Sequence, residues 1–217
     1  MVDTRALAKT LDKAARNAAP VPQISNEIEL SLADAYKVQR QSIARRKARG
    51  ETVIGIKVGF TSRAKMIQMG VHDLIRGQLT DAMAVEDGGE LDTTRFIHPR
   101  IEPELAFMLN KPLSGRVSAL QAMAAVEAIA PAMEIIDSRY ADFKFSLEDV
   151  VADNASSSGF VVGPWRSRTA DIANLGITME FDGRPVQIGS SAAILGHPVR
   201  ALVAAARLAG EAGMTLK

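Results

Sequence analysis

The segment Ile101-Glu-Pro-Glu-Leu-Ala-Phe107 constrains the fold more than any other part of this sequence. Successive side chains of a β-strand point to opposite faces, so Glu102 and Glu104 emerge on one face and the apolar residues on the other. Two carboxylates this close repel each other unless a positive charge lies between them. The pattern predicts a strand whose acidic face is either solvated at a sheet edge, where Pro103 is tolerated, or turned toward a cation.

A third acid favours the cation. Glu134 lies in the apolar run Pro131-Ala-Met-Glu-Ile-Ile136, and a lone carboxylate in such a run is rarely buried without a partner. Hard divalent cations such as Mg²⁺ and Mn²⁺ prefer carboxylate and water oxygens. Glu102, Glu104 and Glu134 therefore form a candidate metal site that leaves positions open for substrate or water, although their spacing alone also allows the solvated edge.

The composition excludes several other chemistries. The 217 residues contain no cysteine, which excludes disulfides, thiolate metal sites and thiol nucleophiles. The 26 basic and 25 acidic residues are mixed along the chain and give a net charge of +1, so we expect no nucleic-acid partner. The N-terminus is charged and no run approaches the roughly 20 apolar residues of a membrane span. We therefore expect a cytoplasmic protein with no membrane partner.

Local patterns predict two helices before residue 50 and β-rich structure after it. Asp3 or Thr4 caps the first helix, and Ser31 caps a second one that stops at Gly50. The later helices are expected over residues 62–69, 118–130 and 197–212, and the strands over 52–60, 91–97, 101–109, 132–136 and 160–162. Asp182-Gly183 between two β-rich runs, 177–181 and 184–188, predicts a hairpin with a two-residue turn.

This order of elements predicts an α+β protein. A small helical N-terminal portion, residues 1–50, would precede a mixed, mainly antiparallel β core with helices packed on it, residues 51–217. The second part would be the metal-binding catalytic domain. Lys57 lies in its first apolar strand, where an ammonium must either reach a negative charge or extend to the strand's end. Asp81 and the run 153–156 are turn-type residues that could equally cap helices or hold loops.

Six motifs occur in a fixed order over nearly the whole chain: Gly-Ile-Lys57-Val-Gly-Phe-Thr-Ser62, Leu79-Thr-Asp81, His-Pro-Arg-Ile-Glu102-Pro-Glu104, Pro-Ala-Met-Glu134-Ile-Ile-Asp-Ser-Arg139, Val-Ala-Asp153-Asn-Ala-Ser156 and Leu195-Gly-His-Pro198. Together they resemble the 2-oxopent-4-enoate hydratase and 4-oxalocrotonate decarboxylase group of the fumarylacetoacetate hydrolase superfamily. Within that group, Asp137-Ser-Arg139-Tyr140 followed by Phe143-Lys144-Phe145 looks more like the decarboxylases.

The resemblance implies a fumarylacetoacetate-hydrolase-like core in which Glu102, Glu104 and Glu134 ligate Mg²⁺ or Mn²⁺. Lys57 and Asp81 would line the reacting end of the pocket. The residues implied to bind substrate are Leu79, Arg139, Asn154 and Ser156. Members of the family continue beyond the last helix, whereas this sequence ends at Lys217, so we expect the core to lack the family's last strands.

The expected reaction is the metal-dependent decarboxylation of a small 2-oxo dicarboxylic acid, 2-oxohex-3-enedioate (4-oxalocrotonate), to 2-hydroxypenta-2,4-dienoate. This step belongs to the meta-cleavage pathway of aromatic-compound degradation. The 2-oxo group accepts the electrons that CO₂ leaves behind, so no organic cofactor is needed. Lys57 is a candidate to orient or neutralise the distal carboxylate, with Asp81 setting its position.

Three alternatives remain open at this point. A 2-oxopent-4-enoate hydratase would use the same metal site and add water instead of releasing CO₂. The chain could also be a non-catalytic subunit that stabilises a partner enzyme. An acylpyruvate hydrolase is disfavoured because no histidine is evident near the metal strand to activate water. In assembly, we expect a homo-oligomer, and the resemblance also allows a complex with the partner hydratase or decarboxylase of the pathway.

Overall fold

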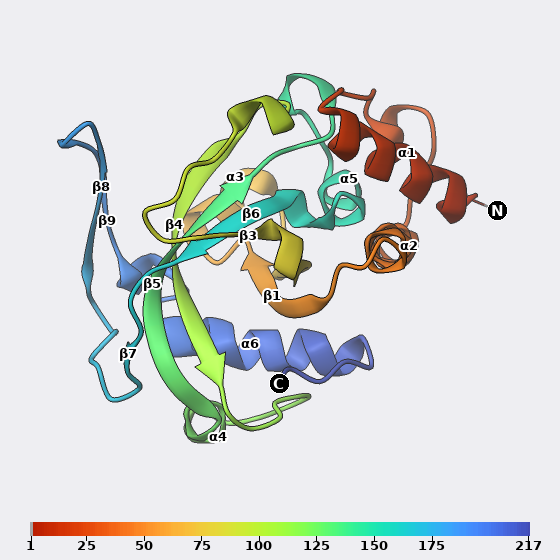
Figure 1. The fold of residues 1–217 in the computed structure, drawn as a ribbon. Coiled ribbons are helices and arrows are strands. Elements are labelled where there is room, and N and C mark those ends of the chain that lie inside the picture. Colours follow the sequence, from red (N-terminus) through yellow and green to blue (C-terminus); the bar gives the residue numbers. More distant parts are fainter. Residues whose placement is uncertain (1) are drawn as a thin grey trace. The chain divides into compact units, whose positions relative to one another are not determined.

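The computed structural model describes residues 2–217 and contains both helices and strands (Figure 1). The α-helices are α1 (Thr4–Asn17), α2 (Leu32–Ala48), α3 (Arg63–Met69), α4 (Ala119–Ala124), α5 (Leu147–Ala152) and α6 (Pro198–Glu211). The strands are β1 (Val53–Gly59), β2 (Ile75–Thr80), β3 (Ala84–Val85), β4 (Arg100–Leu109), β5 (Val126–Ile136), β6 (Ser157–Val162), β7 (Arg166–Ser167), β8 (Gly176–Phe181) and β9 (Arg184–Ser190). The predicted α+β class is confirmed.

The largest sheet places the two acid-bearing strands next to each other. Its strand order is β3-β6-β5-β4, and β7 also pairs with β5. β3 runs parallel to β6, whereas β7 runs antiparallel to β5, so this sheet is mixed, as predicted. Separate two-stranded sheets are formed by β1 with β2 and by β8 with β9. Because β4 and β5 are neighbours, residues from both strands can meet on one face.

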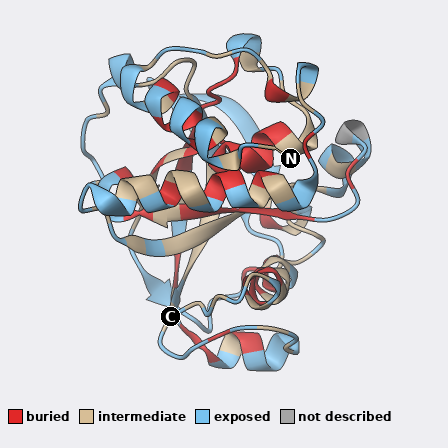
Figure 2. Cartoon of the chain, turned by 90° about the vertical axis from the view of Figure 1, so that its right-hand side faces the viewer, coloured by how far each residue is buried: buried red, intermediate tan, exposed pale blue. Residues whose placement is uncertain are grey.

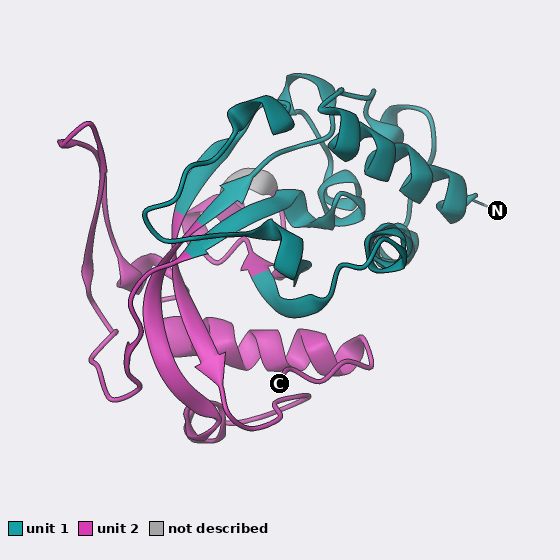
Figure 3. Ribbon diagram, viewed as in Figure 1, with its two compact units in different colours: residues 1–57, 76–102, 134–161 teal, residues 58–75, 103–133, 162–217 magenta. Residues whose placement is uncertain are grey.

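The chain divides into two compact units, shown in teal and magenta in Figure 3. Unit 1 comprises residues 1–57, 76–102 and 134–161. Within it, α2 packs against both α1 and α5, and its inward residues include the fully buried Gln39. The Gln39 Nε2 atom donates to the carbonyl oxygens of Arg76 and Val151, each at 2.9 Å. A buried amide thus ties α2 to β2 and α5.

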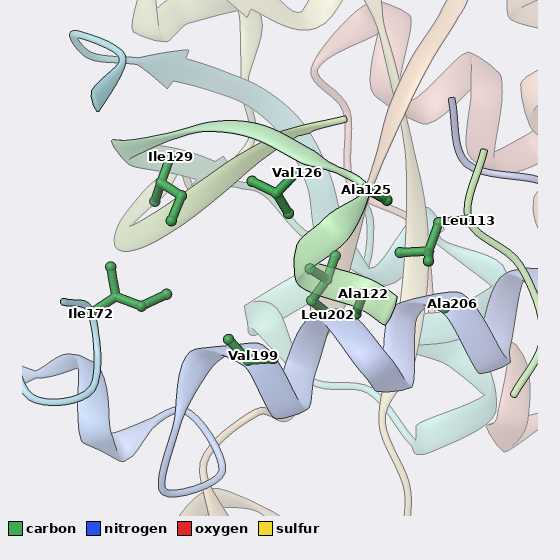
Figure 4. Packing of buried hydrophobic residues seen from close by; sticks show 9 residues of the cluster. All are labelled: Leu113, Ala122, Ala125, Val126, Ile129, Ile172, Val199, Leu202 and Ala206. Atoms are coloured by element: carbon green, nitrogen blue, oxygen red, sulfur yellow. The ribbon is translucent and has the colours of Figure 1, made fainter. Parts of the chain in front are cut away.

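Unit 2 comprises residues 58–75, 103–133 and 162–217. Its core lies where α6 packs on α4 and the start of β5, and Figure 4 shows these side chains. Leu202 of α6 is 6% exposed and Val126 of β5 is fully buried. Burying an aliphatic side chain of this size stabilises a fold by about 1.5–3 kcal/mol relative to exposure. α6 also approaches the Leu113–Gly115 segment closely, because the Gly115 N–H donates to Ala206 O at 2.8 Å.

Most predicted helix ends and the predicted hairpin are confirmed. Asp3 caps α1, and its Oδ1 atom accepts from the backbone N–H of Arg5 and Ala6. Ser31 caps α2, in which Ala35, Val38, Gln39 and Ile43 are buried and the other residues are intermediate or exposed. Figure 2 colours the whole chain by this burial. At the β8–β9 turn, Asp182 and Gly183 have φ of 51° and 71°. Positive φ at both central residues is the two-residue geometry that matches the twist of a hairpin.

Two predictions about local structure are wrong. The helix expected over 118–130 ends at Ala124, and residues 126–136 form the long strand β5. The run Val-Glu-Ala-Ile-Ala fits a helix locally, but pairing with both β4 and β6 decides its conformation. No strand forms over 91–97, where the structure has only a short 3-10 turn, Thr93–Arg95. Strand β2 was missed because its polar residues interrupt the apolar pattern.

Candidate active site

Three carboxylates converge where β4 and β5 lie side by side. Glu102 and Glu104 come from β4 and Glu134 comes from β5. One carboxylate oxygen from each lies within 4.8 Å of the other two. Glu102 is exposed, Glu104 is half-buried and Glu134 is only 3% exposed. The alternation of β4 thus brings its two acids onto one face, toward the third acid.

Glu134 is held by contacts to both of its oxygens. Its Oε1 atom accepts a hydrogen bond from the Ser157 hydroxyl at 2.8 Å. Its Oε2 atom lies 2.8 Å from the Lys57 Nζ atom, and the Lys57 side chain is 12% exposed. A buried carboxylate requires such a partner, because an isolated buried charge is very costly. The ammonium of Lys57 therefore lies at the carboxylate cluster rather than extending to solvent.

Ser157 was not identified from the sequence. It is 1% exposed and is the first residue of β6, the neighbour of β5 in the sheet. Its only signal was its place in the Ser156-Ser-Ser158 run at the start of an otherwise apolar strand. Since a buried hydroxyl needs a hydrogen-bond partner, that run could have indicated a polar neighbour.

The turn before β6 has an unusual backbone. Asn154, Ala155 and Ser156 have φ of 54°, 54° and 59°. The left-handed conformation costs a residue other than glycine roughly 1–2 kcal/mol, so three in succession must be held by their surroundings. The carbonyl oxygen of Ala155 accepts a hydrogen bond from Lys57 Nζ at 3.2 Å. The turn therefore helps to position the ammonium beside Glu134.

The Asn154 side chain holds the turn against β2. Its Oδ1 atom accepts from the Gln78 N–H at 2.8 Å, and its Nδ2 atom donates to the Gln78 carbonyl at 2.9 Å. Gly77 makes this approach possible, because a Cβ atom there would lie under 3.0 Å from the Asn154 carbonyl oxygen. The Ser156 hydroxyl is buried and has no hydrogen-bond partner within residues 2–217. Asn154 is thus engaged inside the protein, whereas Ser156 retains bonding capacity.

Arg139 is engaged in a buried ion pair. Its guanidinium donates to the Asp153 carboxylate and to the Ser158 hydroxyl, and both Arg139 and Asp153 are less than 5% exposed. Burial raises the pKa of Asp153 to about 6, although the charge and hydrogen bonds of Arg139 act in the opposite direction. These contacts anchor the segment that leads into the left-handed turn.

Leu79 and Asp81 lie on and just after β2. Leu79 is half-buried, and its Cδ1 atom faces the Cα of Gly55 on β1. Asp81 is exposed at the start of a 3-10 turn, Asp81–Met83. Its Oδ1 atom accepts from the backbone N–H of Thr52 at 2.9 Å and of Ala82 at 2.8 Å. Both residues therefore contribute to the junction between β1 and β2.

The geometry fits a hard divalent cation. All three donors are carboxylates, the ligand type that Mg²⁺ and Mn²⁺ prefer over imidazole or sulfur. Two ligands come from one strand and the third from its neighbour, so the backbone fixes their separation. Such a set supplies three oxygens and leaves the remaining positions of an octahedral ion for other ligands.

The fold and the carboxylate site define the class of protein. Residues 52–213 match the family model described as fumarylacetoacetate (FAA) hydrolase C-terminal, and the chain belongs to this family. The chain is 58% identical over 211 residues to a 4-oxalocrotonate decarboxylase from a Pseudomonas species, covering 97% of this chain and 82% of that protein. It is 39% identical over 210 residues to a 2-hydroxyhexa-2,4-dienoate hydratase of Comamonas testosteroni, covering 94% of this chain and 79% of that one.

A solved structure of the same kind is also similar. It is the 4-oxalocrotonate decarboxylase of Pseudomonas putida G7 complexed with magnesium and adipate. The TM-score is 0.94 at 41% identity, over 98% of this chain and 82% of that one. This likeness confirms the predicted fumarylacetoacetate-hydrolase-like fold. The expected lack of the last strands stays a prediction. Within residues 2–217, no helix has both the length and the apolar character needed to cross a bilayer.

Proposed function

We propose that this chain is a metal-dependent lyase that decarboxylates 2-oxohex-3-enedioate to 2-hydroxypenta-2,4-dienoate. One observation carries the proposal: Glu102, Glu104 and Glu134 converge, and the ammonium of Lys57 forms an ion pair with the third acid. The 4-oxalocrotonate decarboxylases to which the chain is similar give the reaction, and the magnesium in the similar structure agrees with the all-carboxylate donor set.

A Mg²⁺ or Mn²⁺ ion held by the three glutamates supplies Lewis acidity toward the 2-oxo acid end of the substrate. In the reaction, the bond between C5 and C6 breaks and C6 leaves as CO₂. Its electron pair forms the C4–C5 double bond, the former C3–C4 double bond moves to C2–C3, and the C2 oxygen gains the negative charge. A proton then completes the enol product.

Lys57 is suited to the C2 oxygen. Its ammonium lies 2.8 Å from a carboxylate oxygen of Glu134, at the end of the site where the 2-oxo acid would lie. A cation fixed where negative charge develops stabilises the transition state without reorganising. The Ala155 carbonyl holds the ammonium in place. We therefore propose that Lys57 hydrogen-bonds to the C2 oxygen as its charge grows.

The left-handed turn is the proposed substrate contact on the other side of Lys57. The Ser156 hydroxyl is buried without a partner within the described residues, and it can donate to a substrate oxygen. Asn154 is hydrogen-bonded to Gln78, and Arg139 is hydrogen-bonded to Asp153, and these contacts support the turn. Leu79 and Asp81 fix the β1–β2 junction from which Lys57 projects. These four residues would thus act on substrate through the positions of Lys57 and Ser156.

The test is to incubate the purified chain and Mg²⁺ with 2-oxohex-3-enedioate and to measure released CO₂. We expect turnover that a chelator abolishes and Mn²⁺ or Mg²⁺ restores. Glu104→Ala should lose binding of Mn²⁺, measured by calorimetry, and should lose turnover while its circular dichroism spectrum stays native. Glu127→Ala on the neighbouring strand, β5, is the control, because Glu127 is an exposed glutamate outside the cluster.

Two other outcomes would replace the proposal. Hydration of 2-oxopent-4-enoate with no CO₂ from the dicarboxylate would identify a hydratase, the activity by which the Comamonas relative is named. Binding to a separate enzyme with no turnover of either substrate would identify a non-catalytic subunit. We further propose that the enzyme works in the cytoplasm as a homo-oligomer or with the hydratase of its pathway. Light scattering after size-exclusion chromatography, with and without that hydratase, tests the assembly.

A further inference from the structure

The substrate proposed above carries a second carboxylate at the end remote from the metal. A six-carbon chain built from bonds of about 1.5 Å places its terminal carboxyl carbons about 6 Å apart when extended. A monocarboxylic substrate, such as that of a hydratase, has nothing at this position. A protein that selects the dicarboxylate therefore needs a cation about that far from the carboxylate cluster.

Arg100 lies at the required spacing. It is the first residue of β4, two positions before Glu102 and four before Glu104. Glu102 and Glu104 both point toward the carboxylate cluster. Because side chains alternate along a strand, Arg100 projects from the same face of β4 as these two glutamates. Residues two apart on a strand are separated by about 6.6 Å, close to the length of the substrate. Arg100 is also exposed, so a ligand can reach it.

An aromatic platform holds the guanidinium. The Arg100 Cζ atom lies 3.8 Å from the centroid of the Phe143 ring. Contact over the ring uses the face of the guanidinium, whereas its N–H groups lie in the guanidinium plane and can still bind a carboxylate. Ordering a flexible arginine in advance reduces the conformational entropy that is lost when a ligand binds.

The platform is itself fixed by neighbouring groups. The Phe143 ring packs against the ring of His98 at 5.2 Å and that of Phe145 at 5.4 Å, centroid to centroid. The His98 backbone N–H donates to the buried carboxylate of Asp137 at 2.8 Å. Asp137 comes directly after β5, three residues beyond Glu134. The platform is thus anchored to the strand that carries the third acid.

Lys57 is less suited to this task. Its ammonium is ion-paired with Glu134 and hydrogen-bonded to the Ala155 carbonyl, which places it at the metal end of the site. Lys57 is therefore placed at the 2-oxo acid end of a bound dicarboxylate, and Arg100 at its distal end. On the basis of the proposed function, we propose that Arg100, held on Phe143, binds the distal carboxylate and makes the site selective for dicarboxylic over monocarboxylic 2-oxo acids.

A strong ion pair to the departing carboxylate would stabilise the ground state and oppose loss of CO₂. An exposed, solvated arginine avoids much of this effect, because water weakens the ion pair. Arg100 should accordingly contribute to binding more than to the chemical step. We expect Arg100→Gln to raise KM for 2-oxohex-3-enedioate about five- to tenfold, with kcat changed by less than about twofold.

The decisive experiment measures binding without turnover. 2-Oxoadipate and 2-oxohexanoate differ only in the distal carboxylate, and neither has the double bond through which CO₂ is lost. Calorimetry with the Mg²⁺-loaded full chain should show that Arg100→Gln lowers the affinity for 2-oxoadipate about five- to tenfold. The same substitution should lower the affinity for 2-oxohexanoate less than twofold. Arg100→Lys, which keeps the charge, should restore part of the preference. Arg95→Gln, an exposed arginine on the preceding 3-10 turn, should change neither affinity.

Phe143→Leu provides an independent test of the platform. It should lower the affinity for 2-oxoadipate about two- to threefold in the wild-type background. In the Arg100→Gln background it should cause no further loss of affinity, since both substitutions remove the same interaction. Equal weakening of both ligands by Arg100→Gln, or no preference for 2-oxoadipate in the wild type, would overturn the inference. Failure of the wild type to release CO₂ would instead refute the proposed decarboxylation, and the binding comparison would still decide the role of Arg100.

Discussion

Replacing Gly77 by alanine tests the close contact between β2 and the left-handed turn. The added Cβ would lie under 3.0 Å from the Asn154 carbonyl oxygen and 3.2 Å from the Lys57 Cγ atom. The lysine stem can move, but the backbone carbonyl is fixed by both hydrogen bonds between Asn154 and Gln78. Overpacking of this kind costs about 1–3 kcal/mol. For a chain of this size, that cost lowers Tm by roughly 2–12 °C.

The same substitution should impair turnover more than stability alone explains. Displacing the turn moves the Ala155 carbonyl, which is hydrogen-bonded to the Lys57 ammonium. Because small displacements of a catalytic group can cost up to about a hundredfold in rate, we expect kcat to fall about ten- to hundredfold at a temperature where the variant is folded.

The assays are thermal unfolding followed by circular dichroism and CO₂ release at saturating substrate. Gly55→Ala on β1 is the matched control, because its Cβ would meet only Leu79 Cδ1 at an ordinary 3.8 Å. Gly55→Ala should leave both Tm and kcat near the wild-type values. A Gly77→Ala enzyme with wild-type Tm and kcat would refute this account of the turn.

Two further predictions concern parts of the fold away from the site. Burial raises the pKa of Asp12, but hydrogen bonds from Arg49 and Arg45 outweigh this and hold it below the usual 3.8. The stability that Asp12 contributes is therefore complete above about pH 4 and is lost as pH falls through its folded-state pKa. Asp12→Ala should cost about 1–2 kcal/mol at pH 7 in urea unfolding, because the two arginines that it leaves unpaired are partly exposed, and less at a pH below the folded-state pKa of Asp12. An equal cost at both pH values would contradict the argument. Gly210→Ala should lower Tm, because its Cβ would lie 2.6 Å from Gly115 Cα, while Gly189→Ala, with open space around it, should not. Equal Tm values for the two variants would exclude the close approach of α6.

Local signals predicted those parts of the molecule that local interactions determine. α3 forms within the expected range, 62–69, because the Ser62 hydroxyl and the left-handed Gly70 satisfy the ends of the helix through local contacts alone. Alternation along β4 predicted that Glu102 and Glu104 share a face, since the period of a strand is two. The third acid, Glu134, was predicted from the cost of burying an unpaired charge.

Long-range contacts decide the rest. The left-handed turn contains no glycine, and of its three residues only Asn154 is of a type that adopts positive φ readily. It is held by hydrogen bonds between Asn154 and Gln78, which are 76 positions apart. The strand at 126–130 likewise resembles a helix until pairing with its neighbours is known. The Phe143 platform for Arg100 also joins residues from separate parts of the chain. The local sequence does not determine such features.

The Asn154 side chain pairs with Gln78 of β2 as a residue of a neighbouring strand would, because it accepts from the Gln78 N–H and donates to the Gln78 carbonyl. Among the natural amino acids, only asparagine and glutamine carry both groups on one amide, and glutamine is longer by a methylene. Aspartate lacks the donor, and serine cannot span both contacts in this arrangement. A substitution at this position would therefore remove at least one of the two contacts that hold the turn beside Lys57.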